Sequence, residues 1–166
     1  MMTIPSFGNK ELRVGALRER LTVETASQER FDRISAFAAR EFDVPIALIS
    51  LVDGERLFFK SRFGMDKAEI QKNNAFCDHA IRGGNTLLVN DALKDSVFSD
   101  HPMVVGEPHV RFYAGALLRL ENGRVAGTLC IMDRIPRHLD HVDLAILGGL
   151  RDVVVDEMAR DLRKVI

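Results

Sequence analysis

The sequence has almost no excess charge of either sign. Lys and Arg total 23 and Asp and Glu total 24, so the formal net charge is -1. Chains that bind nucleic acid or an acidic membrane surface usually carry a basic excess that attracts polyanions. The composition therefore gives no support for a nucleic-acid partner or for membrane association.

The sequence also lacks a long apolar run and has few cysteines. The N-terminus, MMTIPSFGNK, has no basic stretch followed by an apolar segment, and no apolar segment nearby approaches the length of a membrane span. We therefore expect a cytoplasmic protein. Its two cysteines, Cys77 and Cys130, lie in apolar surroundings and far apart in sequence, which favours free thiols in a reducing compartment over a disulfide framework. They give no support for a zinc knuckle.

No internal repeat, low-complexity tract or Pro/Gly/Ser-rich linker divides the chain. A length of 166 residues with 46% hydrophobic content suits one domain that buries most of its surface. A weak amphipathic run at Leu12, Ala16 and Leu17 predicts an N-terminal helical extension over residues 1–24. The domain itself is expected over residues 25–166.

Apolar residues at helical spacing predict a long helix at each end of this domain. The first is expected over 25–42, with apolar positions Phe31, Ile34, Phe37, Ala38 and Phe42. The second follows Pro136 and carries a stripe of Leu144, Leu147, Leu150, Val154, Met158, Leu162 and Val165. This stripe could pack on the domain's own sheet or form a two-helix seam with another copy.

Two Gly-containing dipeptides, Asp53-Gly54 and Asn122-Gly123, predict tight hairpins, each between two β-rich runs. The second hairpin joins strands expected over 112–119 and 124–133. Between the hairpins we expect a short helix over 75–81, a brief strand over 87–89, and a loop over 91–109 with one helical turn. This order predicts an α+β fold, in which a central antiparallel sheet carries helices on its faces.

The chain resembles GAF domains in four motifs: FDRISAFAAREFDVPIALISLVDGERLFFKSRFG, FCDHAI, LVNDALKDSVFSDHPMVVGEPHVRFYAGALL and GTLCIMDRIPR. GAF domains are sensory modules of cyclic-nucleotide phosphodiesterases, cyclases, phytochromes and bacterial signalling proteins. The resemblance covers roughly residues 27–163. It implies a GAF/PAS-like sheet of about six strands and a ligand pocket roofed by residues 76–113. It implies no particular ligand, and no cofactor is required.

A small-molecule pocket needs an apolar lining and a few converging polar groups. The expected lining is Phe76, Val89, Phe98, Val104, Phe112 and Tyr113. The expected polar groups are Cys77, His79, Asp91, Arg111, Thr128 and Cys130. Arg111 either binds an anionic ligand or pairs with Asp91 or Asp133, and the ion pair is favoured. Tyr113, the only tyrosine, either contacts a ligand or hydrogen-bonds to the backbone.

The residues show no recognised catalytic constellation. Cys77 and His79 are two positions apart, so on a helix they point apart and cannot act as nucleophile and base on one substrate. His101 and His109, with Asp91, Asp95 or Asp100, match no metal-ligand spacing. Each cysteine is interpreted as a small buried hydrophobe, with a redox switch as the alternative.

We therefore predict a small-molecule-binding regulatory domain rather than an enzyme. Because no effector follows the last helix, the output is expected through a homodimer at the terminal helices or a signalling partner. Two GAF-like alternatives, free methionine sulfoxide reductases and bilin photoreceptors, use cysteine contexts that this sequence lacks; here Cys77 is followed by Asp78 before His79. A reductase of that type and a ligand-free dimerisation module remain the alternatives.

Overall fold

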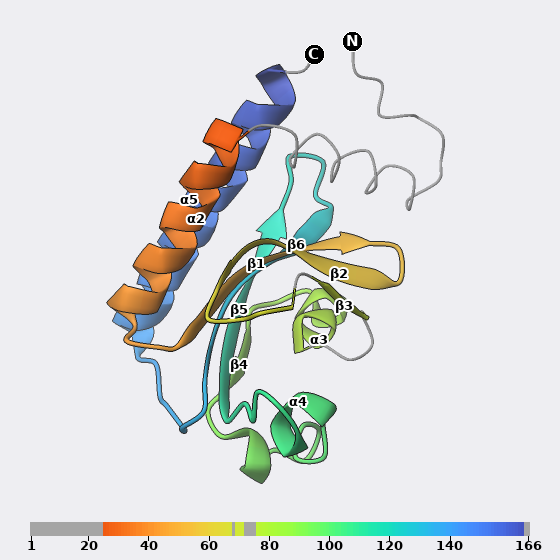
Figure 1. Ribbon diagram of the computed structural model, residues 1–166, viewed down its shortest axis with the longest axis vertical. Helices are drawn as coiled ribbons and strands as arrows, with labels where there is room; N and C mark the ends of the chain where they lie inside the picture. Colours follow the sequence, from red (N-terminus) through yellow and green to blue (C-terminus); the bar gives the residue numbers. More distant parts are fainter. Residues whose placement is uncertain (1–24, 68, 72–75, 165–166) are drawn as a thin grey trace.

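An antiparallel sheet lies between two layers of helices in the computed structural model (Figure 1). The structure describes residues 25–164, except 68 and 72–75. The predicted extension over 1–24 and the end of the apolar stripe, Val165, lie outside the described residues. The α+β prediction is confirmed.

The sheet has six strands in the order β3-β2-β1-β6-β5-β4. Four of them are long, and the two edge strands have three residues each. Their bounds are β1 Ile46–Asp53, β2 Arg56–Phe63, β3 Glu69–Gln71, β4 Leu87–Val89, β5 Phe112–Arg119 and β6 Val125–Asp133. β1 and β6 are therefore the central pair.

Both predicted hairpins are present. Asp53 pairs with Arg56 across the first turn, where Gly54 has a φ of 63°. Gly123 has a φ of 83° in the turn between β5 and β6. Glycine reaches this left-handed region without steric cost, which is why the two dipeptides marked the turns correctly.

Helices α2 (Thr25–Glu41) and α5 (His141–Lys164) pack side by side on one face of the sheet, in antiparallel directions (Figure 1). Arg30 of α2 donates to Glu157 and Asp161 near the end of α5. The stripe of α5 packs internally, since Leu147, Val154 and Met158 are each 1% exposed or less. Phe37 is a correction to the predicted stripe of the first helix, because its side chain is 47% exposed.

The opposite face carries α3 (Phe76–Gly83), the 3-10 turn η2 (Ala92–Lys94) and α4 (Pro102–Val105). The predicted short helix and brief strand are confirmed. The loop predicted over 91–109 holds two short helical turns, η2 and α4, rather than one. Asp91 and His101 cap these turns, because each accepts a hydrogen bond from a backbone N–H two residues later.

The sheet separates two buried apolar clusters. One lies under α2 and α5 and includes Phe31, Phe112 and Ile131. The other lies under α3 and α4 and includes Phe76, Tyr113, Cys130 and other apolar side chains. Adjacent strand residues point to opposite faces, so each long strand contributes to both clusters.

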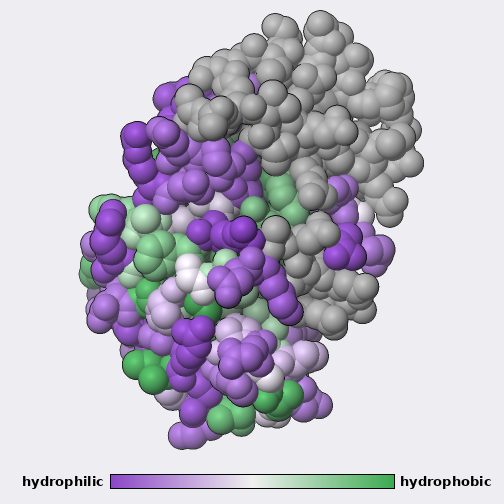
Figure 2. Space-filling model, in the orientation of Figure 1, coloured by the Kyte–Doolittle hydropathy of each residue, from purple (hydrophilic) through white to green (hydrophobic). Residues whose placement is uncertain are grey.

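No helix in the described part of the chain is long and apolar enough to cross a membrane. On the face that Figure 2 displays, hydrophobic colour occurs in several separate places among hydrophilic residues.

Candidate functional site

A stack of aromatic rings covers the α3 face of the sheet. The ring centroid of Phe76 lies 4.7 Å from Phe98, 4.7 Å from His101 and 5.0 Å from Tyr113. Phe76 comes from α3 and Tyr113 from β5, and the other two rings come from the segment before α4. Rings at these distances attract one another beyond the effect of their buried area. The stack therefore ties α3 and the loop to the sheet.

Five side chains form a buried group beside this stack, which we call the thiol cluster: Ser50, Cys77, Tyr113, Thr128 and Cys130. The two Sγ atoms lie 4.0 Å apart. The Tyr113 hydroxyl donates to Cys77 Sγ at 3.4 Å, and Ser50 Oγ lies 3.6 Å from the same sulfur. Thr128 pairs with Ser50 in the sheet register and shares its face with Cys130. All five residues are 3% exposed or less.

Gly115 makes room for the Tyr113 ring. It pairs with Cys130 in the register between β5 and β6, and a Cβ atom at residue 115 would lie 2.2 Å from the Tyr113 hydroxyl oxygen. The absence of a side chain lets the phenol lie along the sheet and reach Cys77. The strand sequence Tyr-Ala-Gly thus positions the only tyrosine against the thiol cluster.

The two thiols differ in acidity. Contact with the Cys130 thiol lowers the pKa of Cys77 to about 6, and the hydroxyl groups of Thr128, Tyr113 and Ser50 act in the same direction, against the effect of burial. The same contact, together with burial, raises the pKa of Cys130 well above its usual value. Burial also raises the pKa of Tyr113. Cys77 is therefore the sulfur that ionises first, while its neighbours keep their protons and donate.

Two buried polar atoms on this face make no hydrogen bond of regular geometry among the described residues: His101 Nε2, and Thr128 Oγ1, which nevertheless lies close enough to Cys77 to lower its pKa. Burial lowers the pKa of His101, so its ring is neutral. Its Nδ1 accepts a hydrogen bond from Met103 N at 3.1 Å, which leaves the proton on Nε2. A buried polar group without a partner costs about 1–3 kcal/mol.

The predicted pocket is filled by its own side chains in this arrangement. Of the expected lining, Phe76, Val89, Phe98, Val104 and Tyr113 are present on the α3 face, each 4% exposed or less. A void of about 10 Å³ remains, with Cys77, Phe76, Tyr113 and Met103 among its walls. A single water molecule needs roughly this volume. The sequence located the residues but not the fact that they close on one another.

Two predicted residues lie elsewhere. Phe112 is a correction: it is 0% exposed in the cluster under α2 and α5, because it is the neighbour of Tyr113 on a strand and must face the other way. His79 lies at the edge of the aromatic stack, half-buried, with its ring 4.8 Å from that of Phe98 in an edge-on arrangement.

Arg111 and Asp91 form the ion pair that the sequence favoured. The guanidinium binds both carboxylate oxygens, through Nε to Oδ1 at 2.8 Å and through Nη2 to Oδ2 at 3.0 Å. Asp91 Oδ1 also accepts from Leu93 N at 3.2 Å and so caps η2. The alternative partner, Asp133, instead binds Arg137. The pair fixes the start of the loop to β5.

Replacing Arg111 by Gln should reduce stability in a pH-dependent way. The Arg111 guanidinium lowers the pKa of Asp91 below its usual value, so the pair stabilises the fold above about pH 4 and loses its effect as the pH falls through the lowered pKa. The difference in Tm between wild type and Arg111→Gln should therefore be largest at neutral pH and shrink in acid. Thermal melts across this range measure it.

Arg119→Gln is the matched control, because the Arg119 guanidinium donates to the backbone carbonyls of Gly84 and Gly123 rather than to a carboxylate. Its Tm difference from wild type should stay constant over the same pH range. An Arg111→Gln difference that is also constant would show that the ion pair does not control the acid response.

The two histidines of the loop, His101 and His109, lie in different surroundings. His101 is turned into the aromatic stack, and His109 Nε2 lies 3.7 Å from a carboxylate oxygen of Glu107. Within the residues that the structure describes, no group of three or more His, Cys, Asp or Glu side chains is placed to hold a metal ion.

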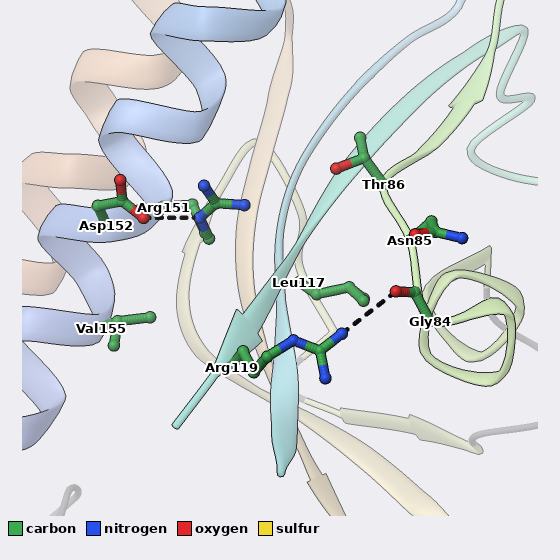
Figure 3. Close-up of a pocket in the computed structure, with 8 residues that line it drawn as sticks. All are labelled: Gly84, Asn85, Thr86, Leu117, Arg119, Arg151, Asp152 and Val155. Carbon is green, nitrogen blue, oxygen red and sulfur yellow. Dashed lines mark hydrogen bonds and ion pairs between the residues drawn. The ribbon is translucent and has the colours of Figure 1, made fainter. Parts of the chain in front are cut away.

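A larger cavity of about 350 Å³ lies between α5, the end of β5 and the turn after α3 (Figure 3). Sequence reasoning missed it, because its walls come from three separate segments. Arg151 donates to Asp152 at 2.9 Å and Arg119 donates to Gly84 O at 3.2 Å, so both guanidinium groups are held by the chain's own oxygens. The residues around it are Gly84, Asn85, Thr86, Leu117, Arg119, Arg151, Asp152 and Val155.

The chain belongs to the GAF domain family, whose pattern matches residues 27–154. The fold and the motifs that suggested a GAF domain therefore agree. Membership of this family supports a sensory or regulatory role.

A cyclic di-GMP phosphodiesterase of Pseudomonas aeruginosa is 42% identical over 134 residues, which cover 80% of this chain and 23% of that protein. The chain thus spans about a quarter of this curated relative. Two solved structures share the fold. The GAF domain of an Acinetobacter phosphoenolpyruvate-protein phosphotransferase is 14% identical with a TM-score of 0.68, and the match covers 92% of this chain and 94% of that one. A free methionine-R-sulfoxide reductase from Neisseria meningitidis, solved with its substrate, is 18% identical with a TM-score of 0.69, and the match covers 92% of this chain and 89% of that one.

Proposed function

We propose that this domain is a small-molecule sensor whose ligand binds on the α3 face after the aromatic stack opens. The observation that carries the proposal is the pair of unpartnered polar atoms, Thr128 Oγ1 and His101 Nε2, beneath an otherwise apolar cover. A ligand that accepts from or donates to these groups recovers hydrogen bonds that the closed arrangement leaves unmade. Ligand binding therefore favours an open arrangement over the closed one.

The sheet offers a route from this site to the helices on its other face. Tyr113 and Cys130 face the site, whereas their strand neighbours Phe112 and Ile131 pack under α2 and α5. A shift of β5 or β6 on the ligand side therefore changes the packing of these helices. In this proposal, the antiparallel pair of α2 and α5 is the output of the sensor.

The output is proposed to act on cyclic di-GMP turnover, by regulating a hydrolase rather than by hydrolysis in this domain. The support is the 42% identity with part of a protein named a cyclic di-GMP phosphodiesterase. Association with a second copy or with a signalling partner would use the outer surfaces of α2 and α5. Phe37 and Val153, which are 47% and 45% exposed, are apolar contacts available there.

The test combines native mass spectrometry with thermal melts against a panel of cyclic nucleotides, cyclic di-GMP and amino acids. A retained or added ligand should raise both the mass and the Tm. Thr128→Val should raise the Tm of the free protein, because it removes a buried unpaired hydroxyl, and should weaken the ligand-induced shift. Thr86→Val, at an exposed position, is the control and should change neither. A bare mass and no Tm shift across the panel would contradict the proposal.

A further inference from the structure

The thiol cluster places two cysteines in reach of each other, although 53 positions separate them in the sequence. Cys77 lies on α3, and Cys130 lies on β6, a central strand that pairs with both β1 and β5. Their Sγ atoms are 4.0 Å apart, and a disulfide bond requires about 2.05 Å. An approach of roughly 2 Å therefore joins them.

The approach can come from α3 without breaking the sheet. The helix has eight residues and ends at Gly83, and it is followed by Gly84 at a φ of 72°. A Cβ atom at either glycine would meet nothing within 4 Å, and the long Arg119 side chain, which donates to Gly84 O, can follow a small shift of this turn. β6, in contrast, is held by strand pairing on both sides.

The surroundings of Cys77 suit a reactive thiolate rather than an inert thiol. The Tyr113 hydroxyl points at its sulfur from 3.4 Å, and Ser50 Oγ lies at 3.6 Å. Hydrogen bonds to a sulfur stabilise its anion and increase the fraction that can attack. The lowered pKa of Cys77 agrees with this geometry.

The void of about 10 Å³ beside Cys77 limits what can reach the sulfur. It has the size of a single water molecule, so a reagent not much larger than water enters with little rearrangement. A bulky disulfide or an aromatic reagent would have to displace the Phe76 stack first. The geometry thus selects a small oxidant.

We propose that Cys77 and Cys130 are a redox pair that small hydroperoxides, with hydrogen peroxide as the simplest, convert to an intramolecular disulfide. The Cys77 thiolate attacks one peroxide oxygen, so that an S–O bond forms and the O–O bond breaks. The departing oxygen takes the proton that Cys77 released and leaves as water or an alcohol.

Cys130 then completes the reaction. Its sulfur attacks the Cys77 sulfenic acid, so that the S–S bond forms and the S–O bond breaks. The hydroxide that leaves takes the Cys130 proton and becomes water. The two sulfurs together give up two electrons, which reduce the peroxide, and a thiol reductant restores the dithiol. This chemistry does not depend on the reversible ligand binding proposed above.

The test treats the reduced 166-residue protein with hydrogen peroxide in native buffer, followed by acid quenching and peptide mapping. The expected product is a monomer lighter by two hydrogen atoms, with the peptides of Cys77 and Cys130 joined and with full reversal by dithiothreitol. Cumene hydroperoxide, which is too large for the void, should react at least about tenfold more slowly. Equal rates for the two peroxides would overturn the proposed role of the void.

Two variants test the order of the steps. Cys130→Ser should stop at a sulfenic acid on Cys77 that dimedone traps, and Cys77→Ser should leave Cys130 unmodified. The opposite pattern, with the dimedone adduct on Cys130, would overturn the assignment. Peptide mapping of the wild-type protein tests formation of the disulfide even if a variant does not fold. If Cys77 and Cys130 of the wild-type protein are still free thiols when hydrogen peroxide has begun to oxidise its methionines, the redox proposal is wrong. The proposal of reversible ligand binding is not affected by that result.

Discussion

Replacing Phe76 by Ala should lower the free energy of unfolding by about 3–5 kcal/mol, the range for removal of a fully buried aromatic ring. Phe76 is 1% exposed and stacks on Phe98, His101 and Tyr113, so one substitution removes three ring contacts as well as buried area. Denaturant unfolding followed by circular dichroism measures the loss.

The same substitution should enlarge the void beside Cys77 into a cavity that accepts a small apolar ring. Benzene should then raise the Tm of Phe76→Ala but not that of the wild type, because the cavity that a large apolar side chain leaves behind can bind a small apolar ring. Phe37→Ala is the control for ring removal, since Phe37 is 47% exposed, and its stability should change by no more than about 0.5 kcal/mol. A loss below about 1 kcal/mol for Phe76→Ala would mean that the stack does not anchor α3.

Gly127→Ala should destabilise the domain by about 4 kcal/mol or more, enough to unfold many domains of this size. Gly127 pairs with Leu51 on one side and Leu118 on the other, in the middle of the sheet. An added Cβ atom would lie 1.7 Å from the carbonyl oxygen of Ser50 and 3.0 Å from Leu51 Cα. Because both obstacles are backbone atoms of a paired strand, the clash cannot be relieved by a change of rotamer.

Gly149→Ala is the matched control for Gly127→Ala. Gly149 lies in α5, where an added Cβ atom meets nothing within 4 Å, and the substitution should stabilise the helix by about 0.5–1 kcal/mol. Thermal and denaturant melts of the two variants should therefore move in opposite directions. A Gly127→Ala protein with wild-type Tm would contradict the close approach of β6 to β1.

The long strands and their turns were predictable because their signals are local, whereas β3 (Glu69–Gln71) lies in a polar segment that gave no strand signal. Asp53-Gly54 and Asn122-Gly123 mark turns through backbone freedom, which depends on the residue itself. The face of Phe112 was equally predictable from the alternation of side chains along a strand, and grouping it with Tyr113 overlooked that period.

Other features depend on packing that no local pattern encodes. The contact of Cys77 with Cys130 requires the register of β6 and the placement of α3 against it, and their separation in sequence argued against a pair. Whether the predicted pocket is open depends on how the Phe76 ring meets its neighbours. The cavity beside α5 has walls from three segments, and no short motif unites them.

The composition makes the thiol cluster optically distinct. The chain has no tryptophan and one tyrosine, and that tyrosine is the fully buried Tyr113. When only tyrosine is excited, the ultraviolet emission of the protein therefore arises from one phenol, whose oxygen lies 3.4 Å from the Cys77 sulfur. At wavelengths longer than those at which the phenylalanines absorb, the tyrosine emission and the tyrosine band of the near-ultraviolet circular dichroism thus follow ionisation, oxidation or opening at this one place, without a label.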